Sequence, residues 1–101
     1  MSRINVIVKL PAAPGKGAEL VKAFDFALEN TMKESGTSHY IVSVDQKDPD
    51  AIWIYEIYNG QSDLDAHMSS DWFKEFGKSL GGLVGGAPEM HFCTPVSGKG
   101  L

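Results

Sequence analysis

The sequence is poor in cysteine and in clustered positive charge. It contains one cysteine, Cys93, so no disulfide can form within the chain. This usage is typical of proteins in a reducing compartment, and we expect a cytoplasmic location. The formal net charge is -4, and the 9 lysine and arginine residues are scattered along the chain. Because nucleic acids and anionic membranes attract clustered Lys and Arg, neither is expected as a partner.

Long apolar runs are also absent from the sequence. No stretch is long enough to cross a bilayer. The first residues, Met1–Val6, contain neither the apolar core nor the small-residue cleavage site of a signal peptide. The glycine-rich stretch GGLVGG at 81–86 follows no expected strand and lacks the spacing of a phosphate-binding loop. We therefore expect no membrane span, no signal peptide and no phosphate cradle.

The sequence does contain hydrophobic periodicity of two kinds. Residues Ile4–Leu10 (INVIVKL) alternate in a β-branched run, which predicts a strand that Pro11 and Pro14 end. Over Gly17–Glu34 apolar residues recur at every fourth position, which predicts an amphipathic helix with Gly36 at its C-terminal cap. The members of this stripe are Leu20, Phe24, Leu28 and Met32.

The remaining segments complete a familiar order of elements. Strands are expected at Ser38–Asp45 and Ala51–Tyr58, joined by an Asp-Pro-Asp turn, and a last strand is expected over 88–96. Between them lies a helical region that Ser62 caps and that breaks at 69–71. The order predicts an α+β, ferredoxin-like βαββαβ fold, in which a four-stranded antiparallel sheet carries helices on one face.

The chain length fits a single domain. With 101 residues, of which 43% are hydrophobic and 22% charged, the composition is that of an ordinary globular protein. We place the domain at residues 1–96. The last residues, SGKGL at 97–101, are expected to form a flexible C-terminal tail.

The third strand, AIWIYEIY at 51–58, is apolar on both of its faces. Alternation sends Trp53, Tyr55 and Ile57 to one face and Ile52, Ile54, Glu56 and Tyr58 to the other. Helices cover only one face of such a sheet, so the other face would be wet in a monomer. Two copies packed sheet to sheet would cover it, and we expect a homodimer.

Four stretches carry a resemblance to a known family. They are PGKGAEL, SGTSHYIVSVDQKDPDAIWIYEIY, SDLDAHMSSDWFKEF and GGAPEMHF. From about Ile4 to Val96, the chain resembles the antibiotic biosynthesis monooxygenase (ABM) domain family, which includes quinol and anthrone monooxygenases. The resemblance implies a dimeric α+β barrel. It also implies a monooxygenase that oxidises a small aromatic quinol or anthrone with O₂ as co-substrate, and without a flavin or metal cofactor.

The chain departs from the family pattern at two places. Many members carry Trp where Tyr58 stands. The haem-degrading branch uses a Trp in the second helix and a His about three turns later. Here those positions hold His67 and Gly77, which argues against haem cleavage.

Glu56 and His67 are the candidate catalytic residues. If Glu56 faces the helices, it meets the helix that carries His67, and a carboxylate bonded to one imidazole nitrogen fixes the tautomer and raises the basicity of the other. Such a pair could deprotonate a phenol or an enol, and the resemblance implies that the resulting anion passes an electron to O₂. The alternative is a satisfied buried pair that only pins helix to sheet.

Five residues are candidate substrate contacts. They are Tyr40, Tyr58, Trp72, Phe73 and Asn5. Tyrosine hydroxyls could bind a substrate oxygen, and the aromatic pair could line a flat pocket. Each has a structural alternative: the tyrosines could lie at a subunit seam, Phe73 could be core packing, and Asn5 could face solvent.

No metal site is predicted. The histidines at 39, 67 and 91 lack ligand spacing, and Cys93 on a strand is typical of an inert apolar position.

Two other functions remain open from the sequence. The same fold hosts isomerases of small phosphorylated keto sugars, which would need a basic anchor such as Lys9, Lys74 or Lys78. A non-catalytic dimer that binds a small molecule is the other alternative, since folds of this kind can keep a pocket and lose the chemistry.

Overall fold

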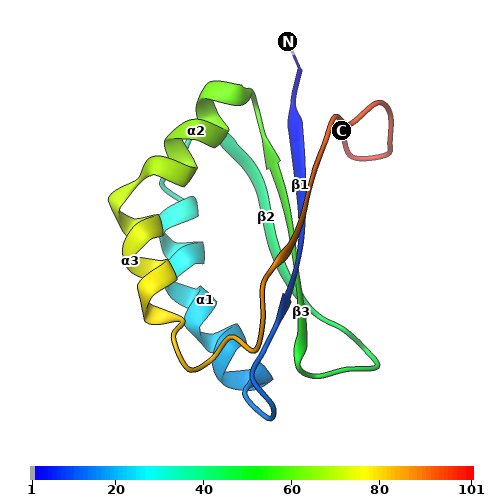
Figure 1. Ribbon diagram of the computed structural model, residues 1–101. Coiled ribbons are helices and arrows are strands. Elements are labelled where there is room, and N and C mark those ends of the chain that lie inside the picture. The colour runs from blue at the N-terminus through cyan, green and yellow to red at the C-terminus, as the bar shows by residue number, and fades with distance from the viewer. Residues whose placement is uncertain (1) are drawn as a thin grey trace.

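The computed structural model of the chain describes residues 2–101. Its four strands pair antiparallel in the order β2-β3-β1-β4, and three helices cover one face of this sheet (Figure 1). The elements are β1 (Ile4–Pro11), α1 (Gly17–Thr31), β2 (Thr37–Val44), β3 (Ala51–Tyr58), α2 (Gln61–Ser69), α3 (Asp71–Ser79) and β4 (Glu89–Cys93). The ferredoxin-like prediction is therefore confirmed.

The core lies between the helices and the sheet. Alternate residues of β1 point at the helices and are buried, while Leu20 and Phe24 from the stripe of α1 pack against them. On β3, Ile52 and Ile54 complete the same layer and are 0% and 2% exposed. The predicted alternation along both central strands thus places one apolar face on the helices. Among residues 2–101, no helix has the length and hydrophobicity to cross a membrane.

The helix ends differ from the sequence prediction. Helix α1 ends at Thr31 with Met32 at its C-cap, so Gly36 does not cap it. Gly36 serves a long-range contact instead, because a Cβ there would lie 2.2 Å from Oδ1 of Asp63. Helix α2 begins after Gly60, so Ser62 lies within its first turn and is not the cap.

The predicted break at 69–71 is confirmed and divides the helical region into α2 and α3. Ser70 is the N-cap of α3, and its Oγ accepts a hydrogen bond from the backbone N–H of Phe73 at 3.3 Å. The same hydroxyl donates to the carbonyl of His67 at 2.7 Å. One serine therefore ends α2 just after His67 and starts α3 just before Trp72, which fixes how these two side chains face each other.

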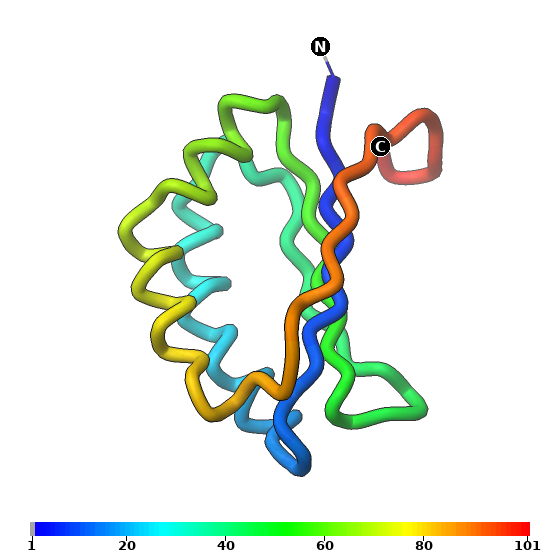
Figure 2. Tube along the Cα trace, viewed as in Figure 1, coloured from blue at the N-terminus to red at the C-terminus, as the bar shows by residue number. Residues whose placement is uncertain are grey.

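The face of the sheet away from the helices is only partly covered. Ile41 and Tyr55, neighbours on β2 and β3, are 49% and 40% exposed there. The chain beyond β4 turns back on this side of the sheet (Figure 2), where residues 97–101 line a hollow together with Ile57. An apolar surface therefore remains open on one half of this face.

Candidate active site

Glu56 is a carboxyl placed in the apolar layer of the sheet. It lies on β3 between Val6 of β1 and Tyr40 of β2, faces the helices, and is 7% exposed. The alternation of β3 sets this orientation, because Ile54 and Tyr58 on the same face are also buried. The orientation that the sequence analysis left as a condition, with Glu56 facing the helices, is the one in the structure.

An apolar cavity of about 150 Å³ opens beside Glu56. Its walls come from β1, β2, β3 and the start of β4 on one side and from α1 and α3 on the other, and Tyr40 and Glu56 are the polar residues among the described residues that line it. The lining residues that close it on the helix side are Phe24, Phe73, Phe76 and Leu80. We call this space the inner cavity.

Burial changes the acidity of Glu56. Loss of water around the carboxylate raises its pKa from 4.5 to about 7; the Tyr58 hydroxyl lowers this pKa, and the charge of Glu34 raises it. The Tyr58 hydroxyl donates to Oε1 of Glu56 at 2.5 Å. A carboxyl with a pKa near neutrality can both take up and release a proton at physiological pH, which is the property of a general acid or base.

His67 lies in the wall between α2 and the sheet and is 3% exposed. Its ring packs among aromatic rings, with centroid distances of 4.9 Å to Phe73, 5.1 Å to Tyr58 and 5.2 Å to Trp72. Its Nδ1 lies 2.9 Å from Oε1 of Glu34. The hydrogen-bond partner of His67 is therefore Glu34, a residue that the sequence analysis did not identify as a candidate.

The predicted hydrogen bond between Glu56 and His67 is wrong. Within residues 2–101, Glu56 bonds to Tyr58 and His67 bonds to Glu34. The physical reason is the turn after α1, which places Glu34 beside α2, within hydrogen-bond distance of His67. Glu56 and His67 nevertheless line the same small cavity, of about 30 Å³, together with Phe73.

Glu34 is the centre of a polar cluster. Its Oε1 accepts hydrogen bonds from Thr37 Oγ1 at 2.7 Å and from His67, and its Oε2 accepts one from Trp72 Nε1 at 3.0 Å. Burial of Glu34 opposes ionisation, but the hydrogen bonds from His67, Thr37 and Trp72 outweigh it, and the pKa of Glu34 lies below its ordinary value. Glu34 is therefore the ionised partner of His67 at neutral pH.

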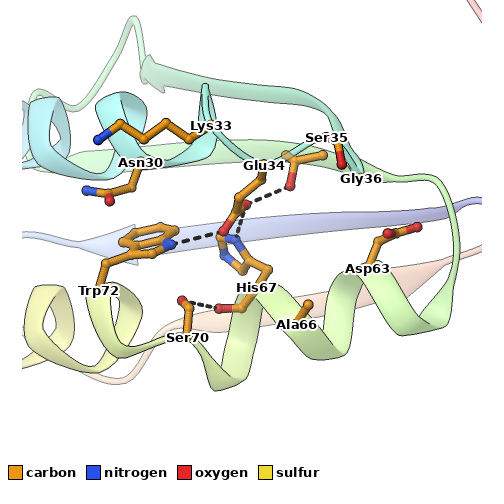
Figure 3. A pocket seen from close by; sticks show the side chains of 11 residues that line it. Asn30, Lys33, Glu34, Ser35, Gly36, Asp63, Ala66, His67, Ser70 and Trp72 are labelled. Atoms are coloured by element: carbon orange, nitrogen blue, oxygen red, sulfur yellow. Dashed lines mark hydrogen bonds and ion pairs between the residues drawn. The ribbon is translucent and has the colours of Figure 1, made fainter.

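A groove of about 510 Å³ runs along the outside of this cluster. Figure 3 shows Glu34 reaching from the end of α1 toward His67 on α2 and Trp72 on α3. The groove is polar at its rim, where Lys33 and Asp63 lie. His67 is the residue that lines both this outer groove and the small inner space next to Glu56.

The structure divides the predicted substrate contacts. Tyr40 and Phe73 line the inner cavity, as a contact with substrate would require. Tyr58 is 0% exposed and its hydroxyl is used by Glu56, so its predicted contact with substrate is replaced by contact with the carboxyl. Trp72 lines the outer groove and donates to Glu34, so it does not reach the inner cavity.

Asn5 lies on the wrong side of the sheet for this site. Its Nδ2 donates to the hydroxyl of Tyr55 at 3.3 Å on the face away from the helices. Strand alternation explains this, because Val6 is the neighbour that points at Glu56. The prediction that Asn5 binds the same substrate is therefore corrected.

The three histidines do not converge. His39 and His91 occupy register positions opposite Ile57 and Ile7, on the face away from the helices that carry His67. Residues 2–101 contain no group of three His, Cys, Asp or Glu side chains placed to hold a metal ion. Of the described residues that line the inner cavity, Glu56 and Tyr40 are the polar ones.

The sequence comparison decides the family. The model of the antibiotic biosynthesis monooxygenase family matches residues 3–79. The chain belongs to the antibiotic biosynthesis monooxygenase (ABM) family. The resemblance read from the motifs is confirmed, and the match spans every element from β1 to α3, so that Glu34, Glu56 and His67 all fall inside the ABM domain.

Solved structures share the ABM fold over nearly the whole chain. A candidate antibiotic biosynthesis monooxygenase from Chloroflexus aurantiacus J-10-fl is 31% identical, with 98% of each chain covered and a TM-score of 0.81. Another such candidate, from Caulobacter crescentus CB15, is 28% identical over 95% of this chain and 92% of that one, with a TM-score of 0.87. A conserved protein from Methanosarcina mazei Go1 is also 28% identical, covers 92% of each chain and has a TM-score of 0.84. No curated protein matches the chain.

Proposed function

We propose that this ABM-family protein is a monooxygenase that oxidises a small hydroquinone or related phenol with O₂, without flavin or metal. The observation that carries the proposal is Glu56, a buried carboxyl with a pKa of about 7 at the wall of an apolar cavity. A carboxyl of ordinary acidity is a weak base toward a phenol. Raising its pKa brings the proton affinities of the two groups closer and makes proton transfer easier.

The volume of the inner cavity limits the size of the substrate that can bind. A volume of about 150 Å³ is the size of an apolar cavity that holds one benzene ring. A three-ring anthrone is too large for this space unless the walls move. The cavity therefore favours a single-ring hydroquinone over the anthrone that the family resemblance also allowed.

The inner cavity offers each part of such a substrate a partner. Phe73 and Phe76 provide aromatic walls for the ring, and Tyr40 and Glu56 line the same space. Burial and the nearby charges of Glu56 and Glu34 raise the pKa of Tyr40, which keeps its hydroxyl protonated as a donor. A substrate oxygen can then receive a hydrogen bond from Tyr40 while it gives its proton to Glu56.

The chemistry balances without an added reductant. Glu56 takes the phenolic proton, and the quinolate anion passes an electron to O₂; the radical pair combines to form a carbon–oxygen bond. Loss of water then leaves a hydroxylated quinone. One oxygen atom of O₂ enters the ring, the other leaves as water, and the substrate supplies all the electrons.

We also propose that the protein is a homodimer that packs through the open face of its sheet. Ile41 and Tyr55 are exposed side by side on neighbouring strands of that face. When a second copy removes apolar side chains in such a patch from water, the free energy falls and the dimer is stabilised. The dimeric barrel expected for the family would follow from this contact.

The isomerase alternative gains no support from the site. A phosphorylated sugar needs a basic anchor, and among residues 2–101 no Lys or Arg lines the inner cavity. Of the three candidate lysines, Lys9 lies over the ring of Trp53 on the opposite face of the sheet, 5.4 Å from the ring centroid. Lys74 and Lys78 are exposed on α3.

Oxygen uptake tests the proposal. Purified protein, dialysed against a chelator and free of flavin absorbance, is supplied with single-ring and fused-ring hydroquinones, and uptake above the autoxidation rate is measured. Glu56→Gln is expected to lower kcat by about 10²-fold or more, the usual contribution of a general base. Glu75→Gln, the same change at an exposed position on α3, is the control. Tight binding without turnover in the wild type would favour the non-catalytic alternative.

A further inference from the structure

The inference concerns His67, and its link to catalysis rests on the function proposed above. His67 lies between two carboxyls, one with a lowered pKa and one with a raised pKa. On the outside, Oε1 of Glu34 lies 2.9 Å from Nδ1 of His67. On the inside, His67 shares the lining of a small cavity with Glu56. The ring therefore lies between a polar groove and a small space next to Glu56, which itself lines the inner cavity.

The partners of Glu34 determine which ring nitrogen carries the proton. An ionised carboxylate only accepts hydrogen bonds, and the indole N–H of Trp72 only donates. Thr37 donates to the same oxygen as His67. Because every group around Glu34 must donate to it, Nδ1 of His67 carries a hydrogen.

The same constraint leaves the other nitrogen of His67 as an acceptor. The two nitrogens of an imidazole point to different sides of the ring, so Nε2 faces away from Glu34. When Nδ1 carries the hydrogen, neutral His67 has a lone pair on Nε2. No hydrogen bond between described residues uses Nε2.

We infer that Glu34 is a positioning residue: it fixes neutral His67 as the Nδ1–H tautomer and presents Nε2 as an acceptor to the space shared with Glu56. Thr37 and Trp72 hold Glu34 in place for this task. Nε2 can then accept a proton on the side of Glu56, with which His67 shares a cavity lining.

The variant Glu34→Gln gives this inference a sharp consequence. The introduced amide has one oxygen and one NH₂ group where the carboxylate has two acceptors. Trp72 can only donate, so the amide oxygen must face Trp72 and its NH₂ group must face Thr37 and His67. A hydroxyl can accept, and Nδ1 can accept only if the proton moves to Nε2. Glu34→Gln is therefore expected to invert the tautomer of His67.

The double variant Glu34→Gln with Trp72→Phe should reverse this inversion. Removal of the indole N–H frees the amide to turn its oxygen toward His67, so that Nδ1 again donates. Trp72→Phe alone leaves both oxygens of Glu34 as acceptors and should leave the tautomer unchanged. The tautomer pattern tests the hydrogen bonds that Glu34 makes, and the kinetics below separate a positioning role from a purely structural one.

The experiment is long-range ¹H–¹⁵N NMR of the imidazole nitrogens of His67 at a pH where the ring is neutral. The Nδ1–H form is expected in the wild type, in Trp72→Phe and in the exposed control Glu29→Gln. The Nε2–H form is expected in Glu34→Gln. A wild-type ring in the Nε2–H form, or an unchanged tautomer in Glu34→Gln, would overturn the inference.

Kinetics supply the second readout. We expect Glu34→Gln to lower kcat for the hydroquinone by about 10- to 100-fold with a KM change below about threefold, and the double variant to recover part of kcat. An unchanged kcat in a variant with the inverted tautomer would remove Glu34 from the reaction. If the wild type takes up no oxygen, the proposed function fails, while the NMR result still decides the tautomer.

Discussion

The hydroxyl of Tyr58 donates a 2.5 Å hydrogen bond to the carboxyl of Glu56, two positions earlier on the same buried face of β3. This single donor stabilises the carboxylate less than burial destabilises it, and the pKa of Glu56 remains at about 7. Glu34, which three donors surround, has a lowered pKa instead. The fold thus separates two carboxyls into an ionised one outside His67 and a titrating one inside, a division typical of acid–base sites.

Removal of the Tyr58 hydroxyl should move the pH dependence of activity. The hydrogen bond from Tyr58 lowers the pKa of Glu56, so Tyr58→Phe should raise this pKa above 7. If Glu56 is the base, the acid limb of kcat/KM should move up by about one pH unit, as expected for one hydrogen bond to a charged group. Tyr55→Phe removes a hydroxyl from the opposite face and is the control. A limb that moves down would contradict the account.

Glu56 should also make stability depend on pH. Its pKa is raised in the folded state, so its contribution is fully present below pH 4.5 and is lost as the pH rises through about 7. The gap between these two values corresponds to about 3 kcal/mol. Urea unfolding of the wild type and of Glu56→Gln, at equal protein concentration, should show the free energies of unfolding diverging over this range. A difference that is flat, or that favours the wild type as the pH rises, would contradict the raised pKa.

The inner cavity should set the size of the substrate. Leu80→Ala removes part of its wall on the α3 side and should raise kcat/KM for a two-ring naphthohydroquinone, relative to a single-ring one, by about tenfold. The change should cost about 2 kcal/mol of stability, because Leu80 is partly buried. Leu83→Ala, outside the lining of the cavity, is the control for that loss. An unchanged ratio would place substrate elsewhere.

A charge on the open face of the sheet should prevent dimer formation. Ile41→Asp puts a carboxylate in the exposed patch on β2, where a second copy would have to bury it. Sedimentation velocity should give a dimer for the wild type and a monomer for this variant. Met32→Asp adds the same charge at an exposed position after α1 and should remain a dimer. A monomeric wild type would leave the open face to some other partner.

The strands were predictable because their signal is local. Alternation over Ile4–Leu10 and the apolar run at 51–58 depend only on neighbours along the chain, and the same alternation grouped Glu56 with Ile52, Ile54 and Tyr58 on one face. The helix ends were not predictable in this way. Gly36 looks like a helix cap but is required where Asp63 approaches it from α2, a contact that no local pattern contains.

The partner of His67 was missed for the same physical reason. Glu34 and His67 are 33 positions apart, and they meet only because the turn after α1 passes under α2. One signal was present in the sequence: Glu34 is an acidic residue just past a helix C-terminus, where the helix dipole disfavours a negative charge. A carboxylate in such a place needs other donors, and Thr37, His67 and Trp72 are those donors.

The most direct measurement is a single turnover assay under ¹⁸O₂ with a single-ring hydroquinone, followed by mass spectrometry of the quinone. The account predicts one ¹⁸O atom in the product of the wild type, in chelator-treated protein, and a loss of about 10²-fold in the rate of labelling for Glu56→Gln. A quinone that carries no label, or a variant that labels as fast as the wild type, would contradict the claim that Glu56 starts an oxygenation in this cavity.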